Sequence, residues 1–116
     1  MGYTHYWKIR NAFTDETWNA FVNDVKQVFN TTDIPIANGH GEEGTTPIID
    51  ESKIIFNGVG DDSHESCFVT KSSCNFEFCK TSYKPYDKVV VKVLKLAREH
   101  NPSIELSSDG GYRVFG

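Results

Sequence analysis

The sequence predicts an α+β domain in which two helices pack on one face of a mainly antiparallel sheet. Two segments, 15–30 and 86–100, repeat apolar residues at helical spacing. The segments around and between them alternate apolar and polar residues as strands do. The resulting order is strand, helix, several strands, helix, strand, which favours a ferredoxin-like core with an inserted hairpin.

A first strand is expected near the start of the chain, where aromatic and polar residues alternate from Tyr3 to Ile9. Aromatic residues fall on both of its faces, so neither face should be wholly exposed to solvent. His5 stands among these aromatic residues, and we expect it to be packed and hydrogen-bonded rather than catalytic.

The first helix is expected over 15–30, with Thr14 as its N-cap and two acidic residues at the positive end of its dipole. Its apolar stripe consists of Trp18, Phe21, Val22, Val25, Val28 and Phe29. The second helix, over 86–100, carries a stripe of Val89, Val90, Val93, Leu94 and Ala97 and stops at Asn101 and Pro102.

Between the helices, the segment 38–47 holds four Gly and Pro residues and reads as a mobile loop. Three strands are expected after it, at 53–59, 66–70 and 75–81, with Phe76 and Phe78 on one face of the last. After the second helix, the run IELSSDGGYRVF places a Gly-rich turn between two short strands.

Length and composition bound the class of protein. With 116 residues and 38% hydrophobic content, the chain fits one domain, 1–116, that can bury a core without metal or disulfides. A net charge of −4 gives no overall attraction to nucleic acid or to an anionic membrane. The start of the chain lacks a signal-peptide core, and three cysteines suit reduced thiols, so we expect a cytoplasmic protein.

The stretch FCKTSYKPYD, residues 78–87, is the strongest candidate ligand site, because it leads from a strand into the second helix. A phosphate or carboxylate could accept hydrogen bonds from the helix N-terminus and from Thr81, with Lys80 or Lys84 supplying charge. A base could stack on Tyr83, Tyr86 or Tyr6. The alternative is a capped helix start with packed tyrosines and solvated lysines.

The uncovered face of the sheet adds to this site, since five polar residues could lie on it or in loops beside it: Thr4, Tyr6, Asn57, Glu77 and Thr81. Stacking of nucleic acid on Tyr3, Tyr6, Trp7 and Phe78 is conceivable but lacks a basic stripe. The chain has neither a P-loop nor a dinucleotide-binding glycine motif, and we expect no cofactor.

A second polar cluster, GVGDDSHES, places His64 and Glu65 beside Asp61 and Asp62. His64 and Glu65 could act as a general acid and base, or the acids could hold a divalent cation. A polar hairpin loop is the simpler interpretation. No complete ligand set is visible, so we expect no metal.

Near the end of the chain, Ser107, Ser108 and Asp109 precede Gly110 and Gly111 and suit a turn with positive φ. A serine hydrolase would need a nucleophile elbow such as GxSxG, which the sequence lacks.

The motifs MGYTHYW, IIFNG, HESCF, FCKTSYKPYD and LSSDG together resemble a family of small uncharacterised proteins met in bacteriophages and bacterial genomes. The resemblance spans most of the chain as spaced short motifs. It implies a phage or bacterial setting, which for a phage protein means the host cytoplasm, and it implies no particular activity.

These observations favour a non-enzymatic binding protein that captures a small anionic, nucleotide-like ligand. The resemblance adds that such a protein could interfere with a host defence signal. One alternative is an inhibitor or adaptor that docks a host protein through acidic loops at Glu42, Glu43, Asp61 and Asp62. Another is a small hydrolase that uses His64 and Glu65.

Overall fold

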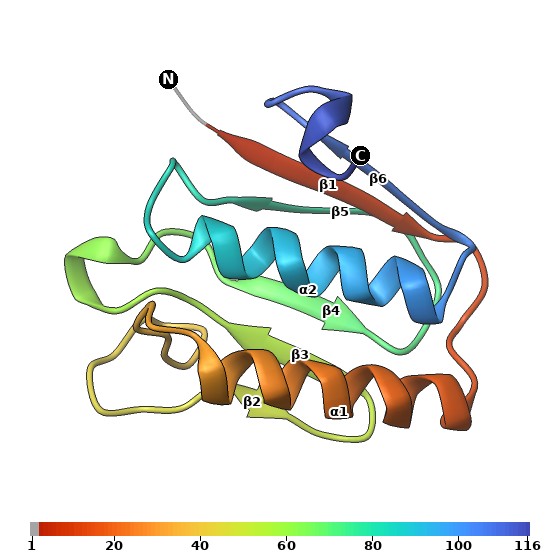
Figure 1. The fold of residues 1–116 in the computed structure, drawn as a ribbon, viewed down its shortest axis with the longest axis horizontal. Coiled ribbons are helices and arrows are strands. Elements are labelled where there is room, and N and C mark those ends of the chain that lie inside the picture. Colours follow the sequence, from red (N-terminus) through yellow and green to blue (C-terminus); the bar gives the residue numbers. More distant parts are fainter. Residues whose placement is uncertain (1–2) are drawn as a thin grey trace.

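The computed structural model describes residues 3–116, so Met1 and Gly2 of the MGYTHYW motif lie outside the described residues. In chain order the elements are β1 (Thr4–Ile9), α1 (Asp15–Thr31), β2 (Ile48–Ile49), β3 (Lys53–Phe56), β4 (Cys67–Thr70), β5 (Cys74–Lys80), α2 (Asp87–His100) and β6 (Ile104–Ser108). Both helices lie on the same side of the strands (Figure 1). The α+β class with two helices on one sheet face is therefore confirmed.

The strands form two antiparallel sheets, with the orders β5-β1-β6 and β2-β3-β4. The sheets are joined where the backbone N–H of Glu65 donates to the carbonyl of Lys80, 3.2 Å away. Taken without β2 and β3, the chain order β1-α1-β4-β5-α2-β6 and the central place of β1 are those of a ferredoxin-like core. The β2–β3 hairpin is the insertion.

Helix α1 forms as its sequence predicts. The hydroxyl of Thr14 accepts a hydrogen bond from the backbone N–H of Thr17, 3.1 Å away, and the side chain of Thr17 caps Thr14 in return. The stripe buries Trp18, Phe21, Val25 and Val28 against α2 and the inner faces of the strands. Among residues 3–116, neither helix is long and apolar enough to cross a membrane.

Helix α2 begins without a side-chain cap. Its N-cap is Tyr86, and neither Thr81 nor Ser82 caps it. Instead, Ser82 and Tyr83 take left-handed backbone conformations, with φ of 51° and 61°, which turn the chain from β5 into the helix. The chain therefore enters the first turn of α2 through two residues with strained, left-handed backbone conformations, and no side-chain hydroxyl caps the helix.

One strand was missed and one expected strand was wrong. The pair Ile48–Ile49 forms β2, which is too short to show an alternating pattern. The run after Gly111 is not a strand, because residues 112–114 form a 3-10 turn, η2 (Tyr112–Val114). This turn brings Phe115 edge-on to the ring of His5, with centroids 5.4 Å apart, so the end of the chain packs on the core instead of pairing with β6.

Candidate functional site

Two residues predicted to bind a ligand at the β5–α2 junction face the interior. Thr81 is fully buried, and its hydroxyl donates to Oδ1 of Asp87 over 2.5 Å. Tyr86 is also fully buried, and its hydroxyl donates to the carbonyl of Glu65 over 2.6 Å. Burial, aided by the nearby Cys79, raises the pKa of Tyr86, which keeps the phenol neutral. Both polar side chains are therefore engaged within the protein.

The backbone amides of this junction are also occupied. The N–H of Lys84 donates to Thr81, that of Asp87 to Lys84, and that of Val89 to Tyr86, at 2.9–3.0 Å. The carboxylate of Asp87 lies in the first turn, where its negative charge would repel an anionic ligand. Lys80 and Lys84 remain half-buried at the junction.

Asn57, the next predicted site residue, ties two loops together. Its side-chain amide donates to the carbonyls of Gly39 and His64, at 3.1 and 2.9 Å. Its Oδ1 accepts from the backbone N–H groups of Gly58 and His64, at 2.8 and 3.0 Å. Because the side chain is buried and its polar atoms are paired, Asn57 fixes loop geometry.

His5 lies at the centre of a buried polar network. Asp87 only accepts when ionised, so Nε2 of His5 donates to its Oδ1 over 2.6 Å, and Nδ1 of the ring shares a second hydrogen bond with the hydroxyl of Ser108, 2.8 Å away. Burial opposes ionisation of Asp87, but the hydrogen bonds from His5 and Thr81 outweigh it and lower the pKa of Asp87.

The same three residue types make up the triad of serine hydrolases, but here they have a structural setting. The ring of His5 is fully buried, between Tyr3 and Phe115, which contact it edge-on. Ser108 also accepts a hydrogen bond from the backbone N–H of Gly110 over 3.0 Å, which holds the turn after β6. The expectation that His5 is packed and hydrogen-bonded is confirmed.

The second predicted cluster does not assemble into an acid–base pair. Oε1 of Glu65 accepts from the backbone N–H of Lys80 over 2.7 Å, so this carboxylate helps to join the two sheets. The ring of His64 forms no hydrogen bond to Glu65 or to another side chain within residues 3–116. The described part of the chain also holds no group of three or more His, Cys, Asp and Glu residues placed to bind a metal.

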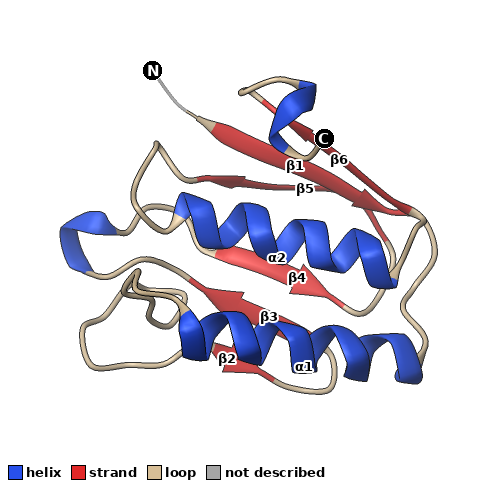
Figure 2. Ribbon diagram, viewed as in Figure 1, coloured by secondary structure: helices blue, strands red, loops and turns tan. Residues whose placement is uncertain are grey.

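The acidic loops are, however, brought together. The backbone N–H of Gly60 donates to the carbonyl of Gly41 over 2.8 Å, which fastens the 38–45 loop to the 59–63 loop (Figure 2). The four exposed acids that these loops carry are Glu42, Glu43, Asp61 and Asp62.

The outer face of the β5-β1-β6 sheet, away from the helices, presents a cluster of aromatic side chains. Tyr6 on β1 pairs with Phe78 on β5. The ring of Phe76 lies 6.0 Å from that of Tyr6 and 5.8 Å from that of Phe78, measured between centroids. Phe76 is 63% exposed and Phe78 is 44% exposed, so this face offers aromatic surface to solvent.

A β-bulge creates a groove beside this cluster. Trp7 pairs with Glu77 and Ile9 with Cys74, so β5 has one more residue than β1 over this stretch. The groove has a volume of about 330 Å³. Its lining residues are Tyr6, Trp7, Lys8, Asn75, Phe76, Glu105, Leu106 and Ser107.

Polar groups surround the aromatic cluster. Lys8 lines the groove, and no salt bridge joins it to an acid within residues 3–116, whereas Glu105 pairs with Arg10 over 2.5 Å. At the other end of β5, Lys80 lies opposite Thr4. Trp7, between Tyr6 and Lys8, turns its side chain to the core, where its indole Nε1 has no hydrogen-bond partner in the described part of the chain.

Tyr6 is held in place by Asp109. Its hydroxyl donates to Oδ1 of Asp109 over 3.1 Å, and Oδ2 of the same carboxylate accepts from the backbone N–H of Thr4 over 3.1 Å. The hydrogen bond to Asp109 raises the pKa of Tyr6, so the ring stays neutral. The turn after β6 thus orients a groove residue.

Sequence reasoning found part of this face and missed the rest. Tyr6 was expected on this face, Phe78 was considered for stacking, and Lys80 was expected at the junction with α2. The expectation that Glu77 and Thr81 lie on the outer face was wrong, because Phe76 and Phe78 are the exposed residues on that face of β5, Glu77 lies opposite buried Trp7, and Thr81 is buried. Tyr3 and Trp7, also considered for stacking, are buried instead. Lys8 was missed, although its spacing of two residues from Tyr6 places it on the same strand face.

Comparison with protein-family models, with curated proteins and with solved structures finds no match to this chain.

Proposed function

We propose that this protein binds a small anionic ligand with a planar base, such as a nucleotide, on the outer face of the β5-β1-β6 sheet. The contact cluster of Tyr6, Phe76 and Phe78 carries this proposal, because it places aromatic rings in solvent on two neighbouring strands. Aromatic side chains on a sheet face are suited to stacking on bases.

Two lysines on this face are the reason for proposing that the ligand is anionic. Lys8 and Lys80 lie at opposite ends of the aromatic cluster, and neither belongs to a salt bridge within residues 3–116. A phosphate next to a stacked base could reach one of them, and the pair would be a charge-assisted hydrogen bond. The hydroxyl of Ser107, which lines the groove, supplies a further donor or acceptor.

The charge distribution favours a small ligand over a long nucleic acid. Glu105 lines the groove and Asp109 holds Tyr6, so acids border the aromatic cluster. The whole chain carries a net charge of −4, which opposes a long polyanion. Lys8 lies opposite Glu105 in the register of β1 and β6, so a single nucleotide would meet one lysine beside one acid, whereas a long polyanion would meet several acids.

The proposal keeps the ligand class expected from the sequence and moves the site. Tyr6 and Lys80 remain in it, whereas Asn57, Thr81 and Tyr86 hold the fold. Lys84, at the corner before α2, lines no part of the groove. Interference with a host defence signal stays a prediction from the family resemblance.

The test is calorimetric titration of the protein with a panel of nucleotides and cyclic nucleotides and with the matching nucleosides. We expect each nucleotide to bind more tightly than its nucleoside, and this difference to shrink with added salt. Lys8→Ala should reduce the difference, whereas Lys95→Ala on the exposed face of α2 should leave it unchanged. Equal affinities for nucleotide and nucleoside would refute the anionic contact.

A second candidate function is docking of a basic partner protein by the acidic loops. The Gly60–Gly41 hydrogen bond favours it, because it holds four exposed acids at one end of the molecule. The test is co-purification at low and high salt with a variant that neutralises Glu43 and Asp61. A partner that is retained equally by this variant would exclude the acidic loops.

A further inference from the structure

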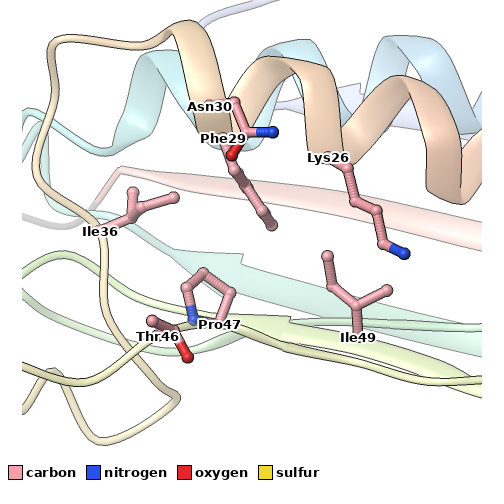
Figure 3. A pocket seen from close by; sticks show the side chains of 7 residues that line it. All are labelled: Lys26, Phe29, Asn30, Ile36, Thr46, Pro47 and Ile49. Carbon is pink, nitrogen blue, oxygen red and sulfur yellow. The ribbon is translucent and has the colours of Figure 1, made fainter.

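A second groove lies between α1 and the segment that leads into β2, far from the sheet face described above. Its volume is about 400 Å³ (Figure 3). Its lining residues are Lys26, Phe29, Asn30, Ile36, Thr46, Pro47 and Ile49. They come from three separate segments of the chain, so the groove is a gap between packed elements and not the surface of one helix.

The floor of the groove is apolar and anchored. The side chain of Phe29 points from α1 toward Ile36, Pro47 and Ile49, which face it from the other side (Figure 3). Behind it, the ring of Phe29 packs edge-on against buried Phe56, with centroids 5.1 Å apart. Because Phe56 belongs to the core, the apolar floor has a fixed shape that an aliphatic chain can fill.

The rim contributed by α1 is polar. Lys26 and Asn30 are four residues apart and therefore share one face of the helix, and both lie beside the apolar side chains (Figure 3). Lys26 belongs to no salt bridge within residues 3–116, although acids outnumber bases in this chain. The ammonium of Lys26 and the side-chain amide of Asn30 therefore lie next to an apolar floor. This arrangement suits a ligand that has one anionic head group and an apolar tail.

We propose that this groove binds an amphiphilic carboxylate, such as a medium-chain fatty acid. The tail packs against Phe29, Ile36 and Ile49, and the carboxylate pairs with the ammonium of Lys26 and accepts a hydrogen bond from the amide of Asn30. The groove lies on α1 and β2, whereas the proposed nucleotide face lies on β1, β5 and β6, so this inference does not depend on the proposed function.

The test is a titration of isotope-labelled protein with octanoate, below its micelle concentration, followed by the backbone amide resonances. We expect saturable shifts at Lys26, Asn30 and Ile49 and none at Tyr6 or Phe76. Lys26→Ala should weaken octanoate binding about tenfold or more. Binding of 1-octanol, which has the same tail and no charge, should change little.

The matched control is Lys92→Ala, because Lys92 also lies on an exposed helix face beside apolar Val91 and Leu96. It should leave octanoate binding unchanged, and the melting temperature of both lysine variants should equal that of the wild type. Shifts that do not saturate, shifts centred on α2, or an equal loss in Lys26→Ala and Lys92→Ala would each overturn the proposal.

Discussion

The imidazole of His5 donates to the carboxylate of Asp87 over 2.6 Å and so fastens strand β1 to the first residue of α2. Thr81 reaches the same carboxylate oxygen from the end of β5, and Ser108 reaches the other ring nitrogen from the end of β6. Strand β1 at the start of the chain thus meets β5, α2 and β6, which follow one another near its end, in one buried network. Polar residues that resemble a ligand site in the sequence hold the strands to the helix.

Thr81→Val should destabilise the protein by about 1.5–3 kcal/mol, because it removes a hydrogen bond to an ionised carboxylate and leaves the shape of the side chain unchanged. Urea unfolding gives the change in free energy. The control is Thr31→Val, since exposed Thr31 donates only to a carbonyl of its own helix, and it should cost less than about 0.5 kcal/mol. An equal loss of unfolding free energy in the two variants would contradict a stabilising hydrogen bond between Thr81 and Asp87.

Asp87 should make stability depend on acidic pH. The pKa of Asp87 is lowered in the folded state, so its contribution is fully present above the ordinary carboxyl pKa of about 3.9 and is lost as the pH falls through the folded pKa. Between about pH 5 and pH 2.5, the wild type should therefore lose more unfolding free energy than Asp87→Asn. Other acids with lowered pKa values, such as Asp15, are present in both proteins and cancel.

Leu94→Ala should cost about 2–5 kcal/mol of unfolding free energy, because Leu94 is fully buried on the inner face of α2. Leu96→Ala makes the same substitution two residues further along, where the side chain is only half-buried, and should cost less than about 2 kcal/mol. The measurement is again urea unfolding. A larger loss at Leu96 would mean that the buried face of α2 has been misassigned.

The three thiols should differ in reactivity. Cys67 and Cys79 are buried, and a hydrogen bond with Cys79 together with burial raises the pKa of Cys67, whereas Cys74 is half-buried at the start of β5. In the native protein we expect Cys74 to react first with a thiol reagent, and all three thiols to react in denaturant. Peptide mass mapping identifies the labelled residue, and rapid native labelling of Cys67 would contradict the packing.

The helices could be predicted from the sequence because their signals are local. The cap at Thr14 and the apolar stripes of both helices depend on residues within a few positions of one another. β2 and η2 could not be predicted in the same way. Two-residue β2 exists only through pairing with β3, and η2 is accompanied by the packing of Phe115 on His5, a residue at the other end of the chain.

The candidate site was harder to predict because it depends on side-chain direction. Thr81 and Tyr86 look like ligand residues in the sequence, but the left-handed corner at Ser82 and Tyr83 turns them inward. Strand register decides which side chains reach the outer face, and a shift by one residue would reverse it. The bulge that exposes Phe76 has no signature of its own in the sequence.

The most direct test of the proposed function is the affinity of Phe76→Ala for whichever nucleotide the wild type binds, measured by calorimetry. Stacking on an aromatic side chain contributes about 1–3 kcal/mol per base, so we predict a loss of roughly 5- to 150-fold. Phe76 is largely exposed, so stability should change by less than about 1 kcal/mol. Tyr112→Ala, which removes another exposed aromatic ring that lines no part of the groove, should bind like the wild type. Unchanged affinity in Phe76→Ala, or an equal loss in Tyr112→Ala, would contradict a base-stacking site on this face.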